Sequence, residues 1–81
     1  MSHPPPENDT MKQHLIQRRR LINNMIERAE YYPQYYSMAA LEKAKTHMQA
    51  ADNALEQERF SRAVFEQTQA FRQFINATKG E

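Results

Sequence analysis

Histidine, cysteine and serine carry much of the metal binding and nucleophilic catalysis found in proteins, and this sequence offers little of that chemistry. It contains no cysteine, and its three histidines are widely separated: His3, His14 and His47. A helical zinc site needs ligands three or four residues apart, so this spacing predicts no metal site. Each serine lies in the N-terminal tail or where a helix should begin, and helix capping accounts for that residue type there. We therefore expect no enzyme, no metal and no cofactor.

All four tyrosines of the chain lie in one short segment around a proline: Tyr31, Tyr32, Tyr35 and Tyr36. Pro33 should end a preceding helix, because it lacks a backbone N–H and disfavours helical backbone at the residue before it. The tyrosines are therefore expected at a corner between two helices. They suit either the local packing of that corner or an exposed surface that docks a partner, since tyrosine combines a large apolar ring with a hydrated hydroxyl. All four are candidate partner-binding residues.

The only run of basic residues is Arg18, Arg19 and Arg20, which shares the predicted first helix with Arg28. These four arginines are the candidate residues of an alternative function, nucleic-acid binding. A nucleic-acid surface needs positive charge repeated along one stripe, whereas the next helix introduces acidic residues, so the charge pattern disfavours it. Arg18 differs from the other three arginines because it lies within the apolar stripe of the first helix, three residues after Leu15. We predict that Arg18 forms an interface ion pair with an acidic residue of the second helix or of another chain.

Three segments show the three- and four-residue apolar periodicity of amphipathic helices. The first is expected over about residues 11–31, with Asp9 or Thr10 as its cap. Its apolar stripe consists of Met11, Leu15, Ile22, Met25, Ile26 and Ala29. The second is expected over about residues 34–58, because Pro33 suits the first position of a helix.

The apolar stripe changes phase between Leu55 and Phe60, because the step of five residues breaks helical spacing. This predicts a chain reversal and a third helix over about residues 61–77, with Ser61 as its cap. Its apolar stripe consists of Phe60, Val64, Phe71 and Phe74. The connection over residues 57–60 contains neither glycine nor proline, so one continuous helix is the rival interpretation. Gly80 is a reasonable position for the end of the last helix.

Residues 47–70 carry small and aromatic residues that resemble one hairpin of the tetratricopeptide family: Ala51, Phe60, Ala63 and Ala70. The sequence departs from the family pattern where that pattern has tryptophan, tyrosine, an aromatic residue and proline: His47, Ala54, Gln67 and Ile75. The chain also has no room for the three or more repeats that such arrays need. The resemblance implies a helical hairpin and no particular function.

The 81 residues form at most one small domain, which buries only about 60% of its unfolded surface. Oligomerisation or a partner protein is the usual remedy without disulfides. We therefore expect an all-α protein, either a small three-helix bundle or a helical hairpin plus an N-terminal helix, that is dimeric. The net charge of +1 and the lack of a membrane-spanning or signal segment favour a cytoplasmic protein that does not bind membranes. The expected boundaries are a disordered proline-rich arm over residues 1–9, a helical domain over residues 10–78 and a tail over residues 79–81.

These patterns predict a small protein–protein interaction module, an adaptor, chaperone-like binder or regulator that buries amphipathic helix faces against itself or a partner. Methionine adapts readily to different partner surfaces, so Met48 joins Arg18 and the four tyrosines as a candidate partner-binding residue. Nucleic-acid binding through the basic face of the first helix is the alternative.

Overall fold

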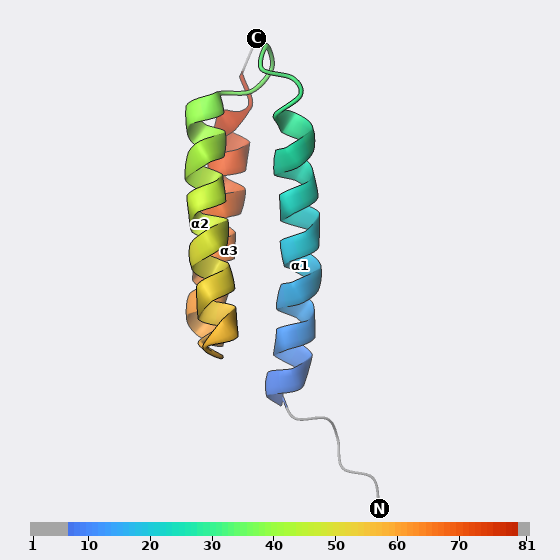
Figure 1. Ribbon diagram of the computed structural model, residues 1–81, viewed down its shortest axis with the longest axis vertical. Helices are drawn as coiled ribbons and strands as arrows, with labels where there is room; N and C mark the ends of the chain where they lie inside the picture. The colour runs from blue at the N-terminus through green and yellow to red at the C-terminus, as the bar shows by residue number, and fades with distance from the viewer. Residues whose placement is uncertain (1–6, 80–81) are drawn as a thin grey trace, which may run out of the picture.

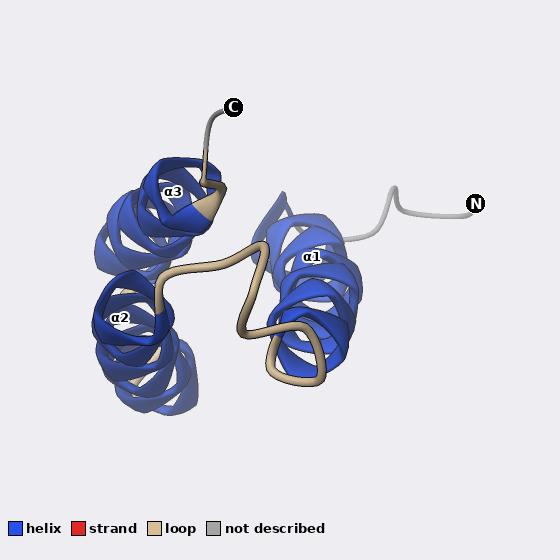
Figure 2. Cartoon of the chain, turned by 90° about the horizontal axis from the view of Figure 1, so that it is seen from above, coloured by secondary structure: helices blue, strands red, loops and turns tan. Residues whose placement is uncertain are grey.

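The computed structural model describes residues 7–79, which form three helices: α1 (Glu7–Ala29), α2 (Met38–Glu56) and α3 (Phe60–Ala77). This part of the chain contains no strand, and its fold is the predicted all-α three-helix bundle. Helices α2 and α3 form a hairpin, and α1 runs alongside it (Figure 1). Seen from above, α2 and α3 lie side by side while α1 stands across from them (Figure 2).

The break between α2 and α3 confirms the chain reversal that was predicted from the change of phase in the apolar stripe. Glu58 adopts a left-handed backbone conformation with a φ of 58°. The Glu58 N–H donates to the Leu55 carbonyl over 3.0 Å, and the Arg59 N–H donates to the Ala54 carbonyl over 2.8 Å. These two bonds form a Schellman motif, in which Glu58 occupies the position that usually holds glycine. The rival interpretation of one continuous helix is therefore wrong.

Helix α2 begins at Met38, four residues later than predicted. Ser37 caps it, because the Ser37 hydroxyl oxygen accepts a hydrogen bond from the Ala40 N–H over 3.4 Å. Pro33 lies in the preceding turn, so its assignment to the first position of the helix was wrong. The start of α2 is therefore determined by the Ser37 side chain, which satisfies a free backbone N–H of the first turn. It is not determined by the fixed φ of Pro33.

Helix α1 begins at Glu7 and ends at Ala29. Asp9 and Thr10 therefore lie inside the helix and do not precede it as caps, and the predicted disordered arm does not extend to residue 9. Residues 1–6, which contain the three consecutive prolines, lie outside the described residues.

Helix α3 ends at Ala77, as predicted, but it begins at Phe60 with Arg59 in the cap position. The Arg59 side chain makes no capping hydrogen bond. Ser61 lies inside the first turn, so its assignment as the cap was wrong. Gly80 lies outside the described part of the chain.

The corner between α1 and α2 is tied to the C-terminal end of α3. The Ser37 N–H donates to the Ala77 carbonyl over 2.7 Å, and the Lys79 N–H donates to the Tyr35 carbonyl over 2.9 Å. The Lys79 ammonium also donates to the Pro33 carbonyl over 3.1 Å. Lys79, assigned to the tail from the sequence, therefore helps to position the corner that carries the tyrosines.

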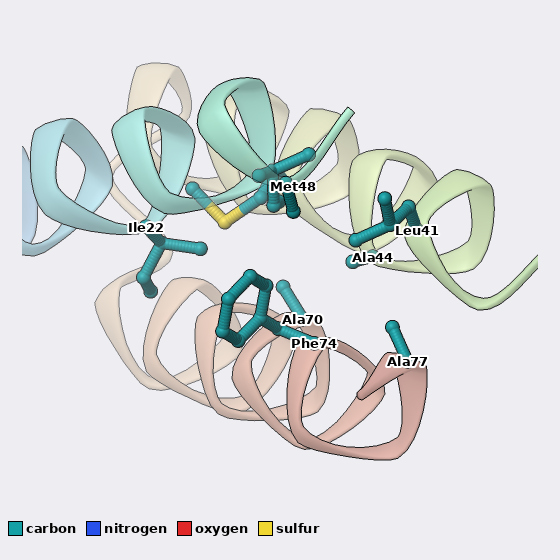
Figure 3. Packing of buried hydrophobic residues seen from close by; sticks show 9 residues of the cluster. Ile22, Leu41, Ala44, Met48, Ala70, Phe74 and Ala77 are labelled. Atoms are coloured by element: carbon teal, nitrogen blue, oxygen red, sulfur yellow. The ribbon is translucent and has the colours of Figure 1, made fainter. Parts of the chain in front are cut away.

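Alanines line the interface within the α2–α3 hairpin, where small side chains let two helices approach closely. Five of them are fully buried: Ala44, Ala51, Ala63, Ala70 and Ala77. Phe74 of α3 points into the core toward Met48 of α2, near Ile22 of α1 (Figure 3). Met48 is only 3% exposed, so the prediction that it offers an adaptable contact surface is wrong.

Candidate partner-binding groove

The tyrosine corner divides into one packed ring and three exposed rings. Tyr36 is partly buried, and its ring centroid lies 5.7 Å from that of Phe74. Tyr31, Tyr32 and Tyr35 are exposed, and the Tyr32 and Tyr35 centroids lie 6.4 Å apart. Local packing of the corner therefore applies to Tyr36, whereas the docking of a partner by the three exposed tyrosines stays a prediction.

The arginine run of α1 points in several directions, because successive residues of a helix are turned by about 100°. Arg19 faces α2, where its Nε lies 3.3 Å from an Asp52 carboxylate oxygen. Arg20 lines a polar hollow together with Arg19, Asn23 and Asn24, whereas Arg18 lines a different hollow, between α1 and α3. The ion pair with α2 that was predicted for Arg18 is therefore made by Arg19 instead. Its predicted pairing with another chain stays a prediction.

Two hollows follow each other along the side of α1 that faces α3. The first has a volume of about 280 Å³ and is lined by Arg18, Leu21, Ile22, Met25 and Phe71. The second has a volume of about 220 Å³ and is lined by Met25, Arg28, Ala29, Tyr32, Tyr36 and Phe74. Met25 belongs to both hollows, so they form one continuous depression, which we call the α1–α3 groove.

Large apolar side chains are exposed at and beside this groove. Leu21 is 63% exposed and Phe71 is 43% exposed. Ile75, which is also exposed, follows Phe71 by one helical turn on the same side of α3. Phe71 was expected in the apolar stripe of the third helix, but α1 does not cover it. Contiguous exposed apolar surface rimmed by polar residues marks interaction sites.

Sequence reasoning missed Leu21. It lies directly beside Ile22 and four residues before Met25, so it has helical spacing to one member of the stripe. The sequence did offer one signal for this residue, because Leu21 widens the apolar stripe of α1 on one side. Only the positions of the neighbouring helices show which side of α1 stays open.

The two hollows of the groove are lined by two basic side chains, Arg18 and Arg28, and by no acidic one. Glu27 lines an adjoining hollow that shares Leu21, Met25 and Arg28 with the groove. Among the described residues no carboxylate lies within ion-pair distance of Arg18 or Arg28. On the α2 side of α1, the Lys45 ammonium contacts Glu30 at 2.9 Å and Glu42 at 3.3 Å. The hydrogen bonds that the Lys45 ammonium donates, first to Glu30 and then to Glu42, raise the pKa of Lys45.

Two buried polar side chains hold α3 against its neighbours. Glu66 is 4% exposed; its carboxylate lies 2.7 Å from His47 Nδ1 and 2.8 Å from the Arg62 guanidinium. The Gln67 amide is fully buried and donates to the Leu15 carbonyl of α1 over 2.9 Å. Sequence reasoning missed both residues, although their helical spacing from the buried alanines of α3 was a signal. They position the helices and do not reach the groove.

The described residues contain no cluster of three or more side chains that could hold a metal ion. None of the described helices combines the length and the apolar character needed to cross a membrane. A scan against protein-family models, a search of curated proteins and a search of solved structures all find no match for this chain. The functional argument therefore depends on the residues of the groove.

Proposed function

We propose that this protein is a small protein–protein interaction module, an adaptor or regulator that holds an amphipathic helix of its partner in the α1–α3 groove. The observation that carries the proposal is the exposed apolar surface of Leu21 and Phe71 in a groove between two helices, with exposed Ile75 one helical turn after Phe71. A partner helix docks in such a groove through apolar residues spaced three and four positions apart. It would lie against α1 and α3 as the fourth helix of a bundle.

The exposed tyrosines extend this surface at one end. Tyr32 lines the second hollow of the groove, and Tyr31 and Tyr35 belong to the same corner. Tyrosine is enriched at protein interfaces, where its ring is buried and its hydroxyl finds a polar partner. These side chains therefore support a binding surface longer than the two hollows alone.

The other predicted uses of this surface have less support. Nucleic-acid binding needs one positive stripe, whereas Arg19 is paired with Asp52 and Arg20 lies on another side of α1 than Arg18. A homodimer would use the same apolar surface. It stays a prediction, and the oligomeric state of the free chain tests it.

The proposal can be tested with a display library of 18-residue amphipathic helices selected on the wild-type protein. The selected peptides should bind the Phe71→Ser variant about tenfold or more weakly, because a central aromatic anchor contributes over ~1 kcal/mol to binding. Phe65→Ser is the matched control, since Phe65 is 50% exposed on the same helix but lies under Arg62, away from the groove. Equal losses for both variants, or no selected peptide at all, would overturn the proposal.

A further inference from the structure

This inference rests on the proposed function and names the partner's chemistry. We infer that the α1–α3 groove selects a helix of another protein whose apolar stripe is flanked by acidic residues, and that Arg18 and Arg28 make this selection. Both arginines line the groove, one in each of its two hollows.

The spacing of the two arginines defines what they can recognise. Arg18 and Arg28 are ten residues apart on α1, which corresponds to about 15 Å along the helix axis. Leu21 and Met25 lie between them in the groove. A helix that buries its apolar stripe on Leu21 and Met25 would reach both guanidinium groups with carboxylates about three turns apart, or roughly ten or eleven residues.

The two guanidinium groups are also free to bind a partner's carboxylates. Asp52 neutralises Arg19, whereas no carboxylate of the described residues lies within ion-pair distance of Arg18 or Arg28. Glu27 lines an adjoining hollow, which shares Leu21, Met25 and Arg28 with the groove, but the Glu27 carboxylate forms no ion pair with Arg28. A guanidinium group binds a carboxylate through two parallel hydrogen bonds in one plane. Charges at the rim of an interface influence partner choice and association rate, so Arg18 and Arg28 are suited to this role.

The same charges argue against a second copy of this chain as the occupant. A two-fold arrangement that joined this face to itself would bring Arg18 and Arg28 of one copy close to those of the other, and like charges are repelled at an interface. The exposed face of α2, the only helix outside the groove, carries both Glu42 and Lys43 and no continuous apolar stripe. The described part of the chain therefore offers no helix of the required kind, and the occupant is another protein.

The test varies charge on both sides of the interface. In the helix library, each flanking position is Glu, Gln or Lys, and selection on the wild-type protein should enrich Glu at positions ten or eleven residues apart. The variant Arg18→Glu/Arg28→Glu should bind the selected acidic peptide about tenfold or more weakly, because two rim pairs change from attraction to repulsion. Binding should return when the two Glu residues of the peptide are changed to Lys.

The matched control is Arg20→Glu/Lys43→Glu, which changes the net charge equally at two exposed positions outside the groove. Its affinity for the acidic peptide should change less than about threefold, since neither side chain lines the groove and salt screens exposed charges. An equal loss in both double variants would show a general charge effect and overturn the inference.

Other outcomes separate this inference from the proposed function. Peptides that need Phe71 but show no preference for Glu would overturn the charge selection and leave the proposed function intact. A failure to select any peptide would overturn both. A dimer of the free chain at micromolar concentration that Phe71→Ser dissociates would assign the groove to a second copy. Displacement of the acidic peptide by duplex DNA at physiological salt would assign the arginines to phosphates. Either result would overturn the inference.

Discussion

Replacing Leu21 with alanine should leave the fold nearly intact, although leucine is usually a core residue. Leu21 is 63% exposed, so only about a third of its surface is covered in the free protein. Complete burial of a leucine contributes about 1.5–3 kcal/mol, and the covered third therefore contributes about 0.5–1 kcal/mol. The better helix propensity of alanine offsets a small part of this loss.

Leu41→Ala provides the matched comparison, because Leu41 is only 1% exposed in the core of the same bundle. Truncation of a buried leucine lowers the free energy of unfolding by about 2–5 kcal/mol. In a domain of this size each kcal/mol corresponds to about 4–8 °C in melting temperature. Leu21→Ala should therefore lower the melting temperature by less than about 8 °C, and Leu41→Ala by about 8 °C or more, up to complete unfolding.

The assay is thermal unfolding of both variants followed by far-UV circular dichroism, with sedimentation equilibrium to determine the oligomeric state. Leu21→Ala should also weaken the binding of a helical peptide, so that binding is lost while stability is kept. A Leu21→Ala variant as unstable as Leu41→Ala would refute the reasoning. It would mean that Leu21 is buried in solution, against a second copy or against a rearranged α1.

Three further substitutions test the local structure. Glu58→Gly should raise the free energy of unfolding by about 0.5–1 kcal/mol, because glycine adopts left-handed backbone without the steric penalty of a Cβ. An unchanged urea midpoint would contradict this expectation. Gln67→Leu should stabilise the fold by about 1 kcal/mol, since the Gln67 carbonyl oxygen is buried without a partner among the described residues. A lower urea midpoint would instead show that the hydrogen bond from the Gln67 amide N–H to the Leu15 carbonyl outweighs that penalty. Ser37→Ala should lower the free energy of thermal unfolding by about 0.5–1 kcal/mol, because it removes the cap of α2. Ser61→Ala should change that free energy by less than about 0.5 kcal/mol, and the reverse order would contradict the observed cap.

The helix starts show where local sequence rules were insufficient. Pro33 and Ser37 are both acceptable residues at the beginning of a helix, and the structure uses Ser37. The backbone of Tyr35 and Ser37 is paired with that of Lys79 and Ala77, so the chain stays outside a helix until residue 37. That pairing joins residues forty or more positions apart in the sequence, and no local pattern predicts it.

The candidate site was predicted in part. The aromatic corner and the position of Arg18 within the apolar stripe of α1 were visible from residue type and spacing. The division between packed Tyr36 and the three exposed tyrosines was not, because it depends on the position of Phe74. Arg19 took the ion pair expected of Arg18, since the rotation of α1 against α2 decides which arginine faces Asp52.

Residue type and spacing were enough to predict that this protein is helical, that its chain reverses near Glu58 and that its tyrosines gather at one corner. These properties depend on the phase of apolar residues and on backbone preferences, which act over a few residues. Only the tertiary structure decided that Met48 is buried, that Leu21 and Phe71 are exposed, and that Arg18 and Arg28 line one groove. The physical reason is that an apolar face is buried only where another helix covers it, and three helices do not cover every apolar side of α1 and α3.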